Sequence, residues 1–341
     1  MIKKIVIVSN EKFYDSDGNF SCDNIAEKSL PDELKKKFQI EIIGRKSKFK
    51  RAHNLETKKI ETYTNIFSYI QKIFDERKDN NSIYLVLSIS PFTFLSVFIL
   101  SLFKKKIFTY LRSNGYEEYK KIIGSIGPKI YNLMFNYTAK KSILISCRKH
   151  ILMKKKGFVV EPSELDDNWL RNISEKNIKD FKLLYVGRVK VEKGVFSLDN
   201  LLQSLNENLS LTIVGSDKNH KKLKYKNTKI YPIEKDQKKL INFYDECNIF
   251  ILPSFTEGHP MALLEALSRL RPVIIFKDIE HIIGEKKGIF AVERNEKSLL
   301  KILYFIRENY NSIQQEMKKN ILPNKKDFIN NLSKIVSGEI F

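Results

Sequence analysis

The sequence predicts an α/β protein made of two doubly wound domains, each with a parallel sheet. Short apolar runs alternate with amphipathic stretches along the whole chain, and a length of 341 residues exceeds what one core comfortably fills. The apolar runs are continuous rather than alternating, which is typical of parallel strands covered on both faces. Ligands bind beyond the carboxyl ends of such strands, so functional residues are expected directly after strands.

The expected elements follow this alternation through both halves of the chain. In the first half, the predicted strands are 4–8, 39–44, 83–88, 106–111 and 142–146, and the predicted helices include 23–37 and 117–137. In the second half, the predicted strands are 181–187, 209–215, 228–233, 248–254, 272–276 and 288–292, with helices at 194–206, 237–246, 260–270 and 297–309. The polar stretch 161–177 holds the only Trp and has no periodicity, which indicates a junction between a domain of residues 1–165 and a domain of residues 166–325.

Two apolar segments could be mistaken for membrane or targeting signals. The N-terminal run has about five apolar residues, fewer than the roughly 7–15 that a signal peptide needs, so a buried strand is expected. Residues 81–103 carry no charge over 23 residues, a length that could span a bilayer. Pro91 divides them into a strand-length run and a helix-length run, which favours a buried strand, a turn and a helix.

The charge is unevenly distributed. The net charge is +21, and residues 1–160 hold 31 Lys and Arg against 15 Asp and Glu, whereas residues 161–341 hold 30 against 25. This asymmetry indicates an acidic partner for the first half, such as anionic lipid, nucleic acid or a polyanionic substrate, although a general richness in lysine explains part of it. The three cysteines are odd in number and far apart, so reduced thiols in a cytosolic protein are expected, and no metal site is expected.

The first motif with chemical content follows the strand 181–187. Arg188 stands at the strand's tip, and Lys193 precedes the next predicted helix in "VGRVKVEKG". Two cations at a strand end and a helix N-terminus form an anion site suited to a diphosphate. The alternative is an exposed Arg and Lys in a lysine-rich protein.

The second motif is "PSFTEGHPMALLEAL", residues 253–267. Pro260 marks the first turn of a helix, and the turn before it places Glu257 at the helix N-terminus. Glu265 lies inside that helix between apolar neighbours, where a carboxylate needs a partner. The alternatives are that Glu257 is a helix cap and that Glu265 pairs with Arg269 four residues on.

These two motifs resemble those of retaining glycosyltransferases of family four, which have the GT-B fold of two Rossmann-like domains facing across a cleft. "PSFTEGHPMALLEAL" resembles their E-x7-E signature, and "VGRVKVEKG" resembles their GR…KG element roughly 70 residues earlier. The resemblance covers about 181–309, and the first half agrees only in layout. It also implies that residues 326–341 form a terminal helix that packs back on the N-terminal, acceptor-binding domain.

The resemblance implies a role for each matched position, without a metal ion and without a cofactor other than the donor, such as a UDP- or GDP-sugar. Arg188 and Lys193 would hold the donor diphosphate, and Glu265 would hydrogen-bond the ribose. Glu257 would contact the donor sugar, and the turn residues Gly258, His259, Pro260 and Met261 would complete the donor site. The two carboxylates would therefore be unlike the acid and base of a hydrolase.

The first half departs from the family pattern at two places. Relatives carry a glycine-rich loop after the first strand, whereas "SNEKFYDSDGNFS" has only Gly18, which is expected to contribute to the donor site. They also carry a His-Gly pair after a middle strand, where this chain has Asn114 and Gly115. Asn114 is expected to line the sugar site, with Arg112 nearby.

The leading hypothesis is a cytoplasmic glycosyltransferase that acts on a glycan or lipid-linked glycan in surface polysaccharide biosynthesis. The basic first half suggests peripheral contact with the anionic inner membrane face, through Lys104–Lys106 and Lys154–Lys156. The alternatives are a degenerate relative that binds nucleotide sugar or polyanion without transfer, and a nucleotide-sugar epimerase. Nucleic acid is disfavoured, because no stacking motif is interleaved with the basic residues.

Overall fold

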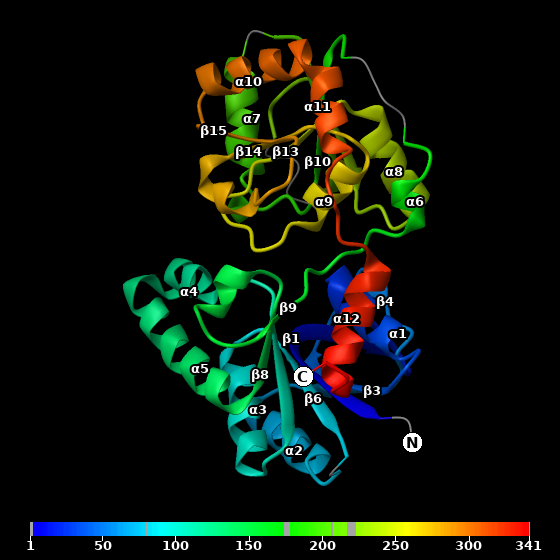
Figure 1. The fold of residues 1–341 in the computed structure, drawn as a ribbon, viewed down its shortest axis with the longest axis vertical. Coiled ribbons are helices and arrows are strands. Elements are labelled where there is room, and N and C mark those ends of the chain that lie inside the picture. The colour runs from blue at the N-terminus through cyan, green and yellow to red at the C-terminus, as the bar shows by residue number, and fades with distance from the viewer. Residues whose placement is uncertain (1–2, 80, 174–177, 206, 217–222, 341) are drawn as a thin grey trace. The chain divides into compact units, whose positions relative to one another are not determined.

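The structure is a computed structural model that describes residues 3–79, 81–173, 178–205, 207–216 and 223–340. It divides into two compact units, one of residues 1–164 with 325–341 and one of residues 165–324 (Figure 1). Each unit is an α/β unit around its own sheet.

The first unit has a nine-stranded sheet centred on β1 (Lys4–Ser16). On one side β1 pairs with β3 (Gln39–Lys46), which pairs with β5 (Ile60–Tyr63). On the other side follow β6 (Ile83–Leu87), β7 (Lys106–Leu111), β8 (Ile143–Ser146) and β9 (Phe158–Val159), all parallel. The antiparallel strands β2 (Asn19–Cys22) and β4 (His53–Asn54) extend the edge beside the end of β1.

The sheet of the first unit is covered on both faces. Ile5 and Ile7 of β1 join one buried cluster, and Val6 and Val8 join another, as the two-residue period of a strand requires. The first cluster is covered by α1 (Ile25–Leu34) and by α12 (Lys325–Ser337), which lies beside α1 (Figure 1). The second cluster is covered by α2 (Ile66–Glu76) and α3 (Pro91–Leu102).

The uncharged segment 81–103 forms β6 and α3, as predicted. Ser90 caps α3 through a capping box with Thr93, and Pro91 occupies the first turn. Among the residues that the structure describes, no helix is long and apolar enough to cross a membrane.

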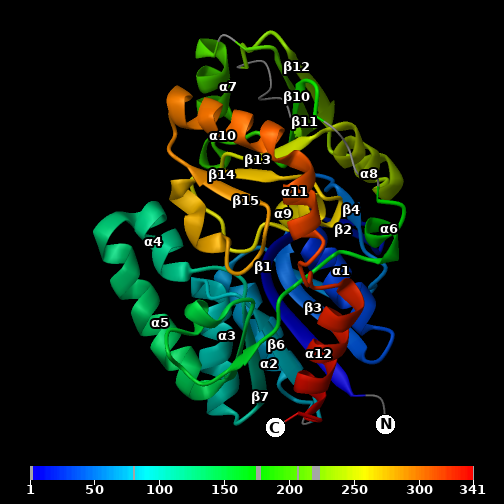
Figure 2. The same ribbon diagram turned by 45° about the horizontal axis from the view of Figure 1, so that its top comes forward.

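The second unit has a six-stranded parallel sheet in the order β12-β11-β10-β13-β14-β15 (Figure 2). These strands are β10 (Phe181–Val186), β11 (Leu209–Ser216), β12 (Thr228–Pro232), β13 (Ile249–Leu252), β14 (Val273–Phe276) and β15 (Ile289–Val292). The helices are α6 (Asp167–Leu170), α7 (Val195–Ser204), α8 (Gln237–Glu246), α9 (Met261–Ser268), α10 (Glu296–Glu308) and α11 (Tyr310–Met317). From β10 the chain first adds strands on one side of the sheet (β11 and β12) and then on the other (β13, β14 and β15). The carboxyl ends of β10 and β13 are therefore the topological switch point, where ligands bind in such sheets.

Three local expectations were wrong. The first strand does not end at residue 8, because β1 continues after a register shift into a hairpin with β2. The predicted helix 117–137 is two helices, α4 (Gly115–Ile123) and α5 (Gly127–Lys141), because Gly124 has a φ of 73° that no helix residue adopts. The predicted helix 23–37 ends at Leu34.

The three cysteines are free, and all three are buried. Burial raises the pKa of Cys22 to about 12 and that of Cys147 to about 12.

Candidate functional site

The best candidate site lies at the carboxyl ends of β10 and β13 in the second unit. The segment after β10 runs through Gly187 and Arg188 to the short helix Val191–Lys193, and the segment after β13 runs from Pro253 to the start of α9. Because β10 and β13 are hydrogen-bonded neighbours, both segments emerge at the same sheet edge. The two sequence motifs are therefore brought together at the switch point.

The central contact of the site joins Lys193 and Glu257. Lys193 Nζ lies 2.6 Å from Glu257 Oε1, and the Ser254 hydroxyl donates to the same oxygen at 2.6 Å. The side chain of Glu257 is 10% exposed and that of Lys193 is 22% exposed, so the pair is largely shielded from water. Both donors take Oε1, and in the described part of the chain no donor contacts Oε2, which can accept a ligand hydroxyl. Glu257 is therefore not a helix cap.

The two segments are held in direct backbone contact. Gly194 adopts a φ of 68°, and a Cβ atom at this position would lie 1.8 Å from the carbonyl oxygen of Pro253. Glycine is required here for both reasons. The Phe255 N–H also donates to the Glu192 carbonyl at 3.1 Å, so the segment that carries Lys193 and the segment that carries Glu257 form one structure.

Arg294 supports the Pro253–Glu257 turn from behind. Its guanidinium lies 4.2 Å from the ring centroid of Phe255 and 4.1 Å from that of Phe276. It donates to the Pro253 carbonyl at 3.0 Å and to the Asp278 carboxylate at 2.7 Å. A planar group that stacks and donates in its plane suits this position.

Two helices begin at the site without a side-chain cap. The N-terminal residues of α7 and α9 follow Gly194 and Pro260, and neither of these residues offers a side-chain acceptor to the first turn. The N–H groups of such a turn and the helix dipole attract anions. Arg188 is exposed at the tip of β10 and makes no ion pair with any residue that the structure describes. The site therefore combines two cations and two free helix starts, an arrangement that can bind a phosphorylated ligand.

The remaining residues of the second motif frame this site. Gly258, His259 and Met261 are half-buried, and Pro260 is buried. The Glu257 carbonyl lies 3.0 Å from the Nε2 atom of His281, in the segment that follows β14. This contact ties the turn to a third strand end.

Glu265 is half-buried inside α9 and accepts a hydrogen bond from the Tyr244 hydroxyl at 2.7 Å. The alternative pair between Glu265 and Arg269 is wrong. Arg269 instead pairs with Asp245 at 2.7 Å and donates to the backbone carbonyls of Trp169 and Arg171. Burial, followed by the nearby Glu265 carboxylate, raises the pKa of Tyr244. Tyr244 therefore stays a neutral donor that orients Glu265.

The other three predicted site residues lie in the first unit. Gly18 is in the β1–β2 hairpin turn, with a φ of 79°, and its N–H donates to Asp15. Asn114 caps α4, because its side chain accepts from the Tyr116 N–H at 3.2 Å. Arg112 follows β7 and forms an ion pair with the buried carboxylate of Glu27. Gly18 thus belongs to a hairpin rather than to a loop that opens a helix.

Sequence reasoning missed three contributors to the site. Ser254 was read only as the end of a strand, although its hydroxyl binds Glu257. Arg294 comes two residues after the end of β15, so the rule that functional residues follow strands could have found it. His281 carries no such signal, because its role depends on the fold of the segment after β14.

The second unit, which holds this site, is similar in sequence to known glycosyltransferases. Residues 166–323 match the family model described as glycosyl transferases group 1. A protein of Bacillus subtilis named as the teichuronic acid biosynthesis glycosyltransferase TuaC is 32% identical over 118 residues, which are 32% of this chain and 30% of that protein. The capsular polysaccharide biosynthesis glycosyltransferase CapM of Staphylococcus aureus is 28% identical over 154 residues, which are 41% of this chain and 40% of that protein. The chain thus spans less than half the length of these curated relatives.

The fold extends over the whole chain. The structure of HepE from Anabaena in complex with UDP has a TM-score of 0.69 to this chain at 10% identity, and the match covers 99% of this chain and 100% of that one. This likeness confirms the predicted fold class, an α/β protein with two parallel-sheet domains. The chain has the GT-B fold, and its residues 166–323 match the group 1 glycosyl transferases in sequence.

Proposed function

We propose that this protein is a retaining, metal-independent glycosyltransferase that moves a sugar from a nucleotide-sugar donor to a glycan or lipid-linked glycan. The observation that carries this proposal is the ion pair between Lys193 and Glu257, which lies near the uncapped N-termini of α7 and α9. The pair lies at the switch point of the sheet, within the residues that match the group 1 glycosyl transferases. Cations and helix N–H groups suit the diphosphate, and an accepting carboxylate suits the sugar hydroxyls.

In the proposed reaction, the bond between the sugar's anomeric carbon and the diphosphate oxygen breaks. Arg188, Lys193 and the first turn of α9 stabilise the negative charge that grows on the leaving diphosphate. These groups supply the charge neutralisation that a divalent cation would otherwise supply, which is why metal independence is part of the proposal. The acceptor hydroxyl bonds to the anomeric carbon on the same face, and its proton passes to the leaving phosphate.

In this proposal Glu257 and Glu265 contact different parts of the donor. Glu257 Oε2 accepts from a donor-sugar hydroxyl, while Lys193 and Ser254 fix the other oxygen. Glu265, oriented by Tyr244, accepts from the nucleotide ribose. The turn Gly258–Met261 lies between these two positions and faces the phosphates. The UDP in the HepE structure supports a nucleoside diphosphate as the donor's leaving group.

The names of TuaC and CapM support a place in surface polysaccharide biosynthesis. The positive charge of residues 1–160 supports an acceptor held at an anionic membrane surface. We therefore propose action at the inner membrane face, with nucleotide sugar and a membrane-linked glycan as partners.

A second candidate is a degenerate relative that binds nucleotide sugar without transferring it. Asn114 favours it, because an amide replaces the histidine expected there and its oxygen is engaged in capping α4. The two candidates share donor binding and differ in turnover.

Donor binding is tested by thermal shift with UDP, GDP, ADP and their glucose and N-acetylglucosamine derivatives. A ligand at 100 times its dissociation constant stabilises the folded state by about 2.7 kcal/mol, which is a measurable rise in Tm. Lys193→Ala should greatly reduce the shift at the same ligand concentration, while Lys190→Ala, a lysine of the same segment without a contact to Glu257, should keep it. Equal shifts in both variants would contradict the site.

Transfer is tested by release of nucleoside diphosphate in the presence of membrane-extracted acceptor, with and without EDTA. Sustained acceptor-dependent release that EDTA does not reduce supports the proposal. If the protein binds the donor but releases no nucleoside diphosphate over many hours with any acceptor tried, the degenerate relative would be favoured.

A further inference from the structure

The helix pair α4 and α5 in the first unit is apolar on two sides. Tyr119, Tyr131 and Phe135 point inward and join a buried cluster with Leu111 and Leu144 of the sheet. A helix at a protein surface normally has one apolar stripe, and that stripe faces the core. The second, outward-facing apolar side of this helix pair is therefore not explained by packing against the core of the first unit.

The outward side forms what we call the α4–α5 ridge, which consists of Ile122, Ile123, Ile126, Ile130 and Leu133. Their exposed fractions are 76%, 46%, 56%, 41% and 67%. Ile122 and Ile123 end α4, Ile126 lies in the turn before α5, and Ile130 and Leu133 lie three residues apart on one face of α5, so the exposed apolar groups gather around the junction of the two helices. Contiguous apolar surface rimmed by polar residues marks an interaction site.

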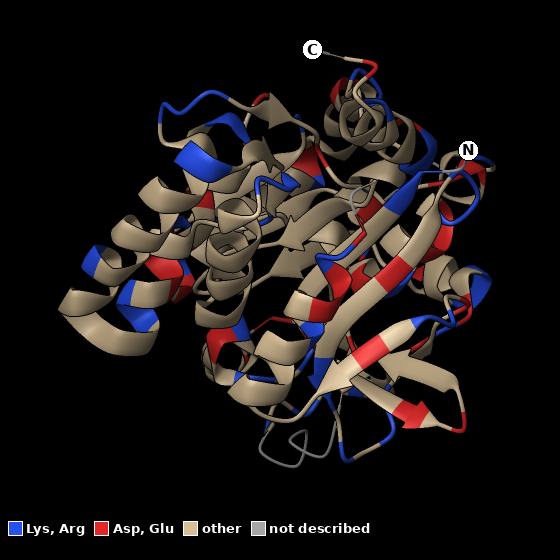
Figure 3. Cartoon of the chain, turned by 90° about the horizontal axis from the view of Figure 1, so that it is seen from below, with Lys and Arg blue, Asp and Glu red and all other residues tan. Residues whose placement is uncertain are grey.

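The charge around the ridge is almost entirely positive. Between residues 81 and 160 the sequence has 14 Lys and Arg and only two acidic residues, Glu117 and Glu118. Lys120, Lys129 and Lys140 are exposed on the two helices, and within the described ranges none of them pairs with a carboxylate. Figure 3 shows blue segments along the helices at its left, which are α4 and α5 by their place in Figure 1.

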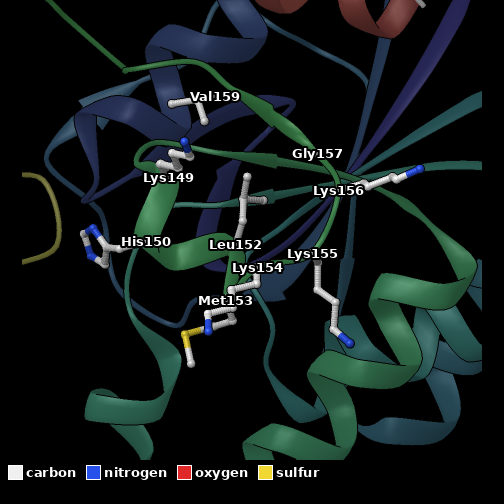
Figure 4. Close-up of a pocket in the computed structure, with 9 residues that line it drawn as sticks. All are labelled: Lys149, His150, Leu152, Met153, Lys154, Lys155, Lys156, Gly157 and Val159. Carbon is white, nitrogen blue, oxygen red and sulfur yellow. The ribbon is translucent and has the colours of Figure 1, made fainter.

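A second cationic feature adjoins the helix pair. The segment after β8 forms a pocket of about 630 Å³ (Figure 4). Its polar lining is Lys149, His150 and Lys154–Lys156, and its apolar lining includes Leu152, Met153 and Val159. Met153 is 45% exposed and Val159 is 51% exposed. Leu152 packs in the same buried cluster as Tyr119 and Tyr131, so one residue of the pocket lining contributes to the core that α4 and α5 cover.

We propose that the α4–α5 ridge and this pocket form a docking surface for an anionic phospholipid bilayer. The ridge side chains enter the boundary between headgroups and acyl chains, and the lysines contact the headgroup phosphates. A second copy of the chain is a poorer occupant, because it would bring two strongly positive surfaces together. The inference extends the proposed function by naming the surface that brings the enzyme to a membrane-linked acceptor, and vesicle binding does not require transfer.

The experiment is sedimentation of the full chain with vesicles. Vesicles of equal phosphatidylglycerol and phosphatidylcholine should bind the protein at 0.1 M salt and release much of it at 0.5 M salt, whereas pure phosphatidylcholine should bind it weakly. Equal, salt-insensitive binding to both compositions would overturn the proposal, and so would absence of binding to either.

Two sets of variants test the surface itself. Ile126→Ser, Ile130→Ser and Leu133→Ser combined should lower the partition coefficient at least tenfold, because the apolar contact is lost. Lys120→Gln, Lys129→Gln and Lys155→Gln combined should lower it about a hundredfold. The matched apolar control is Phe49→Ser, Ile66→Ser and Phe67→Ser combined, at positions exposed elsewhere in the first unit. The matched charge control is Lys226→Gln, Lys229→Gln and Lys238→Gln combined, at exposed positions of the second unit. If controls and test variants bind alike, the ridge is not the docking surface.

Insertion is read directly from fluorescence. The single Trp169 is buried, so Leu133→Trp adds one exposed reporter over a constant background. Its emission should shift to the blue and be quenched by brominated lipid in anionic vesicles, while Phe67→Trp should change in neither respect. Concentration-dependent dimerisation that buries the Leu133→Trp reporter without vesicles would assign the ridge to a second copy and overturn the proposal. Lys193→Ala should bind vesicles like the wild type, so failure of docking is distinguishable from failure of the proposed transfer.

Discussion

Lys193 and Glu257 are 64 residues apart in sequence and 2.6 Å apart in the structure. They meet because β10 and β13 are neighbours in the sheet, although two strands lie between them in the chain. The pair is shielded from water, so its charges interact more strongly than those of a surface ion pair. A ligand that contacts the Lys193 ammonium therefore also meets the Glu257 carboxylate, and the reverse holds as well.

This relationship predicts non-additive effects of mutation. Lys193→Ala and Glu257→Gln should each lower kcat about a hundredfold to a thousandfold, which is typical for loss of one group that stabilises transition-state charge. Because each variant also leaves the other partner misplaced, the double variant should lose little more than either single one. A double-mutant cycle on kcat should therefore give a coupling free energy close to the loss of one single variant, about 2.7–4 kcal/mol. Strictly additive losses would show that the two residues act separately.

The close approach of the two segments predicts that Gly194 cannot be replaced. Gly194→Ala places a methyl group 1.8 Å from the Pro253 carbonyl oxygen and forces a left-handed conformation on a residue with a side chain. The free energy of unfolding should fall by more than about 1 kcal/mol, and donor binding should be lost. The control is Gly284→Ala, because Gly284 has a φ of 58° and open space where its Cβ would lie. Urea denaturation of both variants checks the prediction, and equal losses would remove the steric explanation.

Burial of the thiols predicts low reactivity in the native state. The pKa values of Cys22 and Cys147 are raised to about 12, so almost no thiolate exists at pH 8. Iodoacetamide at pH 8 should leave both unmodified in the native protein and alkylate both in urea, where their pKa values return to the usual range. Peptide mass spectrometry measures the modification at each cysteine. Rapid native alkylation of Cys147 would show that its segment opens readily.

The sequence predicted which candidate residues follow strand ends, but not the contacts that bring them together. Strand ends and a helix start identified Lys193 and Glu257 individually, because local patterns encode these elements. Their contact depends on strand order, which no local pattern encodes. The break at Gly124 was missed because the apolar pattern was followed through it, although Gly124 has a φ of 73° and Pro128 stands in the first turn of α5. The α4–α5 ridge was missed for the same reason, since an apolar residue on a helix is read as core unless its exposure is known.

The stacking of Arg294 predicts a positioning residue that lysine cannot replace. Arg294→Lys keeps a positive charge but loses the planar group that lies against Phe255 and Phe276 and donates to the Pro253 carbonyl. The Pro253–Glu257 turn then loses its support, and kcat/KM for the donor should fall at least tenfold, with the rise in KM larger than the fall in kcat.

The matched control is Arg307→Lys, because Arg307 also stacks on two rings, Phe181 and Tyr304, but lies on α10 and makes no contact with the turn. Arg294→Lys should lose more stability than Arg307→Lys in urea denaturation, because Arg294 is half-buried and also donates to Pro253 and Asp278, whereas Arg307 is exposed. Only Arg294→Lys should change the donor kinetics, because only Arg294 contacts the segment that carries Glu257. If the two variants lose stability and activity in the same proportion, Arg294 contributes to folding alone.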